Sequence, residues 1–231
     1  MVKVILFDID NTLLSFDRFV VETMKSGFKV FNLGAYEDGM YAAFTKINTE
    51  LWHKIEKGEI NLEDLKKIRW NLIFRHLGIE ANGVAFETYF RECLNESAIP
   101  IEGAMDLLEY LHGKYILCAA SNGPYLQQVN RLKIGGMLPY FNDLFISEEI
   151  GSSKPSESFF NTCIERLNAR SCEAINPSEI MIIGDSLTSD MAGGIGSGMK
   201  TCFYNPDNKP IPCGVKLDHQ VTSLTEIKNI L

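Results

Sequence analysis

The sequence predicts an α/β protein with an open, parallel, Rossmann-like sheet flanked by helices and interrupted by an all-helical insert. Short apolar runs alternate with stretches of helical spacing along most of the 231 residues. Several of these runs are continuously hydrophobic, which is typical of strands buried on both faces in a parallel sheet. Residues 16–96 interrupt the alternation, because they show four helical patterns and no convincing strand.

The expected strands and helices follow one another along the chain. The strands are predicted at 2–8, 115–121, 143–147, 179–185 and 200–205. The helices between them are predicted at 103–113, 124–134, 156–169 and 187–198. This alternation favours parallel strands joined by right-handed crossovers.

The insert is expected to form a helical cap domain. Its helices are predicted at 16–32, 36–57, 62–77 and 84–96. Asn61 and Asp64 resemble a helix-start box, and Gly78 is typical of a helix end. The predicted division is a catalytic core at 1–14 and 98–231 and a cap at 15–97, with hinges near 14–17 and 96–101.

Composition indicates a small-molecule enzyme or binding protein. The chain has 22 Lys and Arg against 30 Asp and Glu, a net charge of −8 that argues against a nucleic-acid partner. No apolar run approaches the ~18 residues that suggest a membrane span. The N-terminus is not typical of a secretory signal, and the six cysteines lack metal-ligand spacing, so we expect reduced thiols in a cytoplasmic protein. A monomer or small homo-oligomer is expected.

Polar residues follow each of the first four expected strands, and the third strand is separated from its lysine by a short loop. They are Asp8 and Asp10, Ser121 and Asn122, Lys154, and Asp185 and Asp190. Ligands of open α/β sheets bind outside the carboxyl ends of the strands, so these groups should converge on one crevice. Acids for a nucleophile and Mg²⁺, with a cation and amides for phosphate oxygens, are the equipment for phosphoryl transfer.

Each residue also has an ordinary interpretation. An aspartate at a strand end often forms a turn, and a lysine such as Lys154 is often solvated. Asp190 could simply enrich the first turn of a helix. Asp8 and Asp10, however, are close enough to repel each other unless a cation lies between them. The combination therefore favours a site over four unrelated turns.

Four motifs carry a resemblance to a known superfamily. They are D-I-D-N-T at 8–12, S-N-G at 121–123, K-P at 154–155 and G-D-S-L-T-S-D at 184–190. In this order they resemble the haloacid-dehalogenase-like hydrolases, whose phosphatases carry an inserted helical cap. The resemblance covers the whole core.

The resemblance implies a role for each carboxylate. Asp8 would attack phosphorus and form an aspartyl-phosphate. Mg²⁺ would bind the Asp8 carboxylate, the main-chain carbonyl of Asp10 and Asp185, with Asp190 as a further ligand, direct or through water. Asp10 would protonate the leaving oxygen and then activate water. Dehalogenases lack an acid at the position of Asp10, so a phosphatase is favoured.

The resemblance also implies how the phosphoryl group is held. Ser121 and the Asn122 amide would donate to its oxygens. Lys154 would neutralise charge that develops on it and could be held by Asp190.

The substrate is suggested by two longer stretches. ISEEIGSSKPSESFF and GDSLTSDMAGGIGSGMKTCFYNP resemble the pyrimidine 5′-nucleotidase branch, which implies UMP, dUMP or dTMP as substrates. A base could stack on one of the cap aromatics Phe16, Phe19, Tyr41 and Trp52. A sugar-phosphate or phosphoglycolate phosphatase, a phosphomutase and a non-catalytic binding protein remain alternatives.

Overall fold

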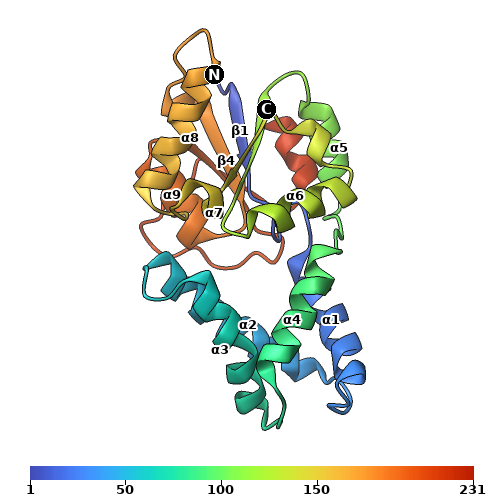
Figure 1. Ribbon diagram of the computed structural model, residues 1–231. Coiled ribbons are helices and arrows are strands. Elements are labelled where there is room, and N and C mark those ends of the chain that lie inside the picture. The colour runs from blue at the N-terminus through green and yellow to red at the C-terminus, as the bar shows by residue number, and fades with distance from the viewer. The chain divides into compact units, whose positions relative to one another are not determined.

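The chain forms two compact units. The computed structural model describes residues 1–231. One unit comprises Met1–Ser15 and Ala98–Leu231, and the other comprises Phe16–Ser97 (Figure 1). The second unit therefore begins one residue later than the predicted cap.

The first unit is built on a sheet of six parallel strands in the order β3-β2-β1-β4-β5-β6. The strands are β1 Val4–Phe7, β2 Ile116–Ser121, β3 Asp143–Ile146, β4 Ile180–Gly184, β5 Lys200–Tyr204 and β6 His219–Val221. The open parallel sheet confirms the predicted fold class. The sequence prediction lacked β6, because this strand has only three residues and only Val221 is buried.

The strand order places the end of β1 at the centre of the sheet. The chain runs from β1 to β2 and β3 on one side, and then returns to β4 on the other side of β1. Such a reversal of strand order opens a crevice at the carboxyl ends. Phe7 is in register with both Ala119 and Ile183, so the residues that follow these three lie at the same edge.

Helices cover both faces of this sheet (Figure 1). The longer ones are α5 Ala104–Leu111, α6 Tyr125–Ile134 and α8 Glu157–Arg170, and the short ones are α7 Ser147–Ile150 and α9 Ala192–Gly196. Phe7 packs in one hydrophobic cluster with Leu107 of α5 and Leu132 of α6. Leu6 packs in the other with Phe159 of α8. Successive strand residues point to opposite faces, which explains the continuously apolar strands.

The predicted helix at 187–198 differs from the observed structure. Residues Leu187–Met191 form a π-helical turn, η3, and α9 follows it. The Asp190 carboxylate accepts a hydrogen bond from the Ser186 N–H at 3.1 Å, so this turn directs Asp190 back toward the end of β4. Turns of this kind occur frequently at functional sites.

The second unit contains the helices α1 Phe16–Val30, α2 Asp38–Glu56, α3 Leu62–Leu77 and α4 Gly83–Asn95. Asn61 and Asp64 exchange side-chain to backbone hydrogen bonds, which confirms the predicted start of α3. Gly78 ends this helix with a φ of 69°, a conformation that favours glycine.

Aromatic rings form the core of the helical unit. Phe44, Phe86 and Phe90 each pack against the buried ring of Trp70. Phe19 packs on Phe90 and is only 3% exposed, so the expectation that Phe19 could stack on a base is wrong. The other three aromatics considered for this role are partly exposed; they are Phe16, Tyr41 and Trp52.

A buried ion pair joins two helices of the same unit. Arg69 of α3 binds both carboxylate oxygens of Glu87 of α4, at 3.0 and 2.7 Å. The guanidinium also donates to Asn48 of α2 and lies 4.8 Å from the ring centre of Phe90. Two-point pairing of this kind fixes geometry as well as charge.

All six cysteines are free thiols, as the sequence predicted. No helix combines the length and apolar character that crossing a membrane requires.

Close packing of α9 on α8 predicts a stability difference between two glycine substitutions. A Cβ atom at Gly193 would lie 2.1 Å from the buried ring of Phe160, whereas one at Gly196 would meet nothing within 4 Å. We expect Gly193→Ala to lower the free energy of unfolding by about 1–3 kcal/mol through overpacking. Gly196→Ala, the matched control, should leave it unchanged or raise it by up to about 1 kcal/mol. Urea unfolding measures both, and equal effects would contradict the packing observed.

Candidate active site

The first two acids are positioned by the end of β1. The Asp8 N–H donates to the Ile183 carbonyl of β4 at 2.9 Å, so the sheet fixes the backbone of Asp8. Asn11 then adopts a φ of 59°, and the N–H of Leu14 returns to the carbonyl of Ile9 at 2.9 Å. Asparagine tolerates this left-handed conformation better than most residues. The resulting turn presents Asp10 at the carboxyl edge of the sheet.

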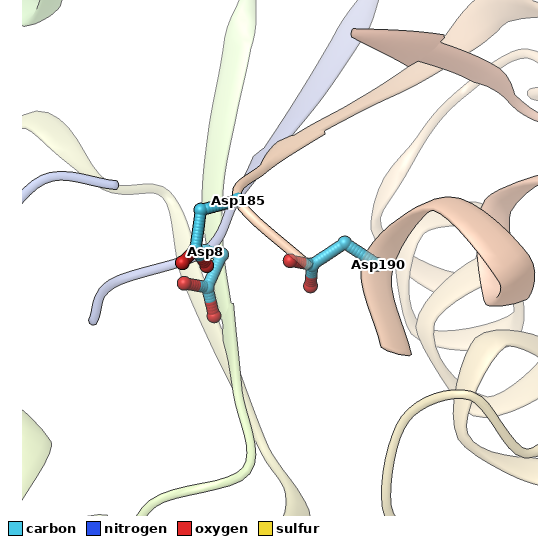
Figure 2. A group of neighbouring side chains, drawn as sticks. All are labelled: Asp8, Asp185 and Asp190. Carbon is cyan, nitrogen blue, oxygen red and sulfur yellow. The ribbon is translucent and has the colours of Figure 1, made fainter. Parts of the chain in front are cut away.

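Three carboxylates meet at this edge. Asp8 follows β1, Asp185 follows β4, and Asp190 belongs to η3. One oxygen from each lies within 4.8 Å of the others, and Figure 2 shows the three side chains directed toward one another. Asp8 and Asp190 are buried, and Asp185 is partly exposed. The structure thus brings together three of the residues predicted as metal ligands.

Lys154 binds two of these acids. Its ammonium nitrogen lies 2.7 Å from Asp8 Oδ1, 2.6 Å from Asp190 Oδ1 and 2.6 Å from the Ala120 carbonyl. The side chain of Lys154 is 2% exposed, so water does not weaken these bonds. Burial acts to lower the pKa of Lys154, but the carboxylates of Asp190 and Asp8 outweigh it and raise the pKa above its ordinary value.

Acidic groups outnumber basic groups in this cluster. Three carboxylates lie around one ammonium. Burial raises the pKa of Asp8 to about 7, against the opposing effect of Lys154 and with a further rise from Asp190. A divalent cation would favour the charged form of these acids, and clustered carboxylate oxygens are the ligands that Mg²⁺ prefers. The residues present therefore fit a magnesium ion.

Gly184 allows Asp190 to reach this position. A Cβ atom at Gly184 would lie 2.2 Å from Asp190 Oδ2. The last residue of β4 must therefore lack a side chain. With Oδ1 bound to Lys154 and Oδ2 bound to the Ser186 N–H, Asp190 has both oxygens engaged.

The residues after β2 form the next part of the site. The Ser121 hydroxyl oxygen accepts hydrogen bonds from the Gly123 N–H and from Gln128, which leaves its own proton to donate. The Asn122 side chain bonds the backbone of Lys154 in both directions, at 2.8 and 2.9 Å. Asn122 thereby fixes the loop that carries Lys154.

Asp10 is bound by two side chains that the sequence analysis did not single out. Arg131 donates to Asp10 Oδ1 at 2.6 Å, and Gln128 donates to Asp10 Oδ2 at 2.8 Å. Gln128 and Arg131 lie three residues apart on α6, so they share a helix face. The signal that could have revealed them is the charged residue Arg131, which directly precedes the buried Leu132 in this predicted helix.

Comparison with known proteins identifies the family. Residues 2–198 match the model of the haloacid dehalogenase-like hydrolases. This chain belongs to that family. The match spans most of the chain and includes every predicted site residue, so the protein is a hydrolase of the haloacid dehalogenase-like type.

Three relatives match nearly the full length of this hydrolase. It is 34% identical to the HAD-hydrolase YfnB of Bacillus subtilis, over 99% of this chain and 95% of YfnB. It is 32% identical to the pyrimidine 5′-nucleotidase PynA of Streptococcus pneumoniae, over 99% of this chain and 97% of that protein. The pyrimidine 5′-nucleotidase YjjG of Escherichia coli is also 32% identical, over 98% of this chain and 96% of YjjG.

Solved structures show the same fold. A crystal structure of YfnB from Bacillus subtilis bound to magnesium is 33% identical, with a TM-score of 0.88 over 100% of this chain and 98% of YfnB. A dehalogenase at 19% identity has a TM-score of 0.81 over 100% and 97% of the two chains. At this low identity, the similarity to the dehalogenase shows only that the two chains share a fold.

Proposed function

We propose that this hydrolase is a Mg²⁺-dependent phosphomonoesterase that forms an aspartyl-phosphate on Asp8 and acts on pyrimidine nucleoside 5′-monophosphates. One observation carries the chemical part of the proposal. A buried aspartate at the end of the central strand binds Lys154 through one oxygen and lies within reach of two further acids. Lys154 keeps the Asp8 carboxylate in place, and its positive charge offsets part of the negative charge of a phosphate.

The first step transfers the phosphoryl group to Asp8. Oδ1 of Asp8 is bound to Lys154, so Oδ2 is the oxygen we assign to attack on phosphorus. A bond forms between this oxygen and phosphorus, and the bond from phosphorus to the ester oxygen breaks. Asp10 gives its proton to the departing oxygen, which leaves as an alcohol.

The second step returns the enzyme to its starting state. A water oxygen attacks phosphorus and the bond to Asp8 breaks, which releases inorganic phosphate. Asp10 takes the proton that the water loses. The two steps together consume one water and yield one alcohol and one phosphate, with both aspartates restored.

The acid cluster would hold the metal. Asp8, Asp185 and the main-chain carbonyl of Asp10 are the proposed ligands, and Asp190 contributes charge directly or through water while it binds Lys154. Bound Mg²⁺ would offset the repulsion between an anionic nucleophile and an anionic ester. The magnesium-bound structure of YfnB supports this assignment.

The phosphoryl oxygens would be held by neighbouring donors. The Ser121 hydroxyl and the main-chain N–H of Asn122 lie directly after β2, which neighbours β1. Lys154 adds positive charge beside the attacked phosphorus. Donors fixed before the reaction stabilise developing charge without having to reorganise.

The relatives favour a nucleotide as substrate. PynA and YjjG, each 32% identical over nearly their full lengths, are pyrimidine 5′-nucleotidases. The glyceraldehyde 3-phosphate phosphatase of Methanopyrus kandleri is more distant, at 25% identity over 87% of this chain and 83% of that enzyme. The insert has partly exposed aromatic side chains suited to stacking on a base; they are Phe16, Tyr41 and Trp52.

A substrate panel tests the proposed specificity. With Mg²⁺, we expect kcat/KM for UMP, dUMP and dTMP to exceed that for glyceraldehyde 3-phosphate and phosphoglycolate by about 10-fold or more, a difference of about 1.4 kcal/mol. Removal of the metal with EDTA should abolish turnover, and added Mg²⁺ should restore it. Equal or faster turnover of the sugar phosphates would overturn the nucleotide assignment. Dependence on a sugar bisphosphate activator would indicate a phosphomutase.

Trapping of the phospho-enzyme tests the two aspartate roles. In Asp10→Asn, kcat should fall by about 10²–10⁴, because the group that activates water is lost. Phosphate from a ³²P-labelled ester should then accumulate on Asp8, detected by acid quench and peptide mass spectrometry. Asp8→Asn should carry no label and lose turnover by on the order of 10⁴ or more. Label on another residue would contradict the assignment of Asp8.

A further inference from the structure

We propose that Gln128 and Arg131 are positioning residues that orient the Asp10 carboxylate for proton transfer. This inference rests on the proposed role of Asp10 as acid and base. Neither residue is among the candidate groups that would touch phosphate or metal, and both belong to α6.

The three side chains form a closed triangle of hydrogen bonds. Nη1 of Arg131 lies 2.6 Å from Asp10 Oδ1 and 2.8 Å from Gln128 Oε1. Nε2 of Gln128 lies 2.8 Å from Asp10 Oδ2. Each oxygen of the Asp10 carboxylate therefore has its own donor, and rotation of the carboxylate would break both bonds.

The chemistry of the triangle permits one arrangement. An arginine only donates, so the side-chain oxygen of Gln128 must face Arg131 and its NH₂ group must face Asp10. A flipped amide would place two donors against each other and leave Asp10 Oδ2 facing an acceptor. Charge-assisted bonds such as that from Arg131 to Asp10 are also the stronger kind.

The rest of the core keeps the triangle in place. Gln128 and Arg131 are each 1% exposed, whereas the Asp10 side chain is 34% exposed and can reach solvent or a ligand. At the start of α6, the Tyr125 N–H donates to Glu148 at 2.7 Å. Two buried side chains of α6, Gln128 and Arg131, thus hold the Asp10 carboxylate, which remains accessible.

Gln128 also connects Asp10 to the phosphate-binding loop. Its Nε2 lies 2.7 Å from Ser121 Oγ and 2.8 Å from Asp10 Oδ2, so one NH₂ group serves both. A Cβ atom at Gly123 would lie 2.6 Å from the same nitrogen, which shows how closely the loop fits around it. The ester oxygen beside a phosphoryl group held by Ser121 would thereby face Asp10.

The triangle is proposed to assist proton transfer by Asp10 and not the attack on phosphorus. When Asp10 gives its proton to the leaving oxygen, Arg131 and Gln128 donate to the carboxylate that forms. When water returns a proton to Asp10, the same bonds keep the oxygens where they were. Loss of the triangle should therefore lower the rate most for esters whose leaving group needs a proton.

Two matched esters separate this role from a purely structural one. Phenyl phosphate expels a basic oxygen that needs a proton, whereas p-nitrophenyl phosphate expels a stable anion. For Arg131→Met we expect kcat/KM on phenyl phosphate to fall roughly 10- to 100-fold, part of what acid–base catalysis contributes, and on p-nitrophenyl phosphate by less than about 3-fold. This parameter reports the first step, so slower hydrolysis of the aspartyl-phosphate does not affect it.

Three further variants complete the design. Gln128→Met also removes the bond to Ser121, so we expect it to slow both esters, with the larger loss on phenyl phosphate. Arg131→Lys should recover part of the rate on phenyl phosphate. Lys133→Met changes an exposed residue of the same helix and should leave both rates unchanged. Circular dichroism and the unfolding midpoint establish that each variant is folded.

The outcomes separate this inference from the proposed function. If the unmodified enzyme hydrolyses neither ester with Mg²⁺, the proposed function fails and this inference fails with it. If it hydrolyses both, but Arg131→Met and Gln128→Met lose equal factors on the two esters, the positioning role is overturned and the proposed function stands. Failure of both variants to fold would assign the triangle a structural role and would also overturn the inference.

Discussion

The ammonium group of Lys154 is the contact on which the rest of the site depends. It binds Asp8, Asp190 and the Ala120 carbonyl within 2.7 Å, and so joins β1, η3 and the end of β2. Removing it would leave buried carboxylates facing one another, an arrangement that costs several kcal/mol per ion. The same contact holds Asp8 and Asp190 close to Asp185, and this cluster of acids is the site proposed for a divalent cation.

Backbone geometry provides the conditions for this contact. The register of β1 with β2 and β4 brings three strand ends level, and the absence of a side chain at Gly184 lets the Asp190 carboxylate lie against the strand. Asn122 fixes the backbone of Lys154. Two side chains of α6 bind Asp10, so the proposed nucleophile and the proposed proton carrier have different hydrogen-bond donors.

The sequence predicted the parts of this arrangement that depend on chain order. Apolar runs predicted five of the strands, and the polar residues after them predicted that Asp8, Asp185 and Lys154 lie near one another, because parallel strands end at one edge of a sheet. Bonds from helix side chains to distant parts of the chain were not predictable in this way. The bonds from Arg131 to Asp10 and from Arg69 to Glu87 join residues 121 and 18 positions apart, and only the packed structure brings them together. The π-helical turn η3, which directs Asp190 back toward β4, was likewise not predicted from the sequence.

Calorimetric titration with Mg²⁺ tests the central claim, that the acids gathered around Lys154 make this edge a divalent-cation site. We predict saturable binding of one ion per chain in the unmodified protein, with binding strongly weakened in Asp185→Asn. Asp207→Asn removes an exposed acid of the same unit and should bind as the unmodified protein does. Absence of saturable binding, or equal affinity in Asp185→Asn and the unmodified protein, would contradict the account.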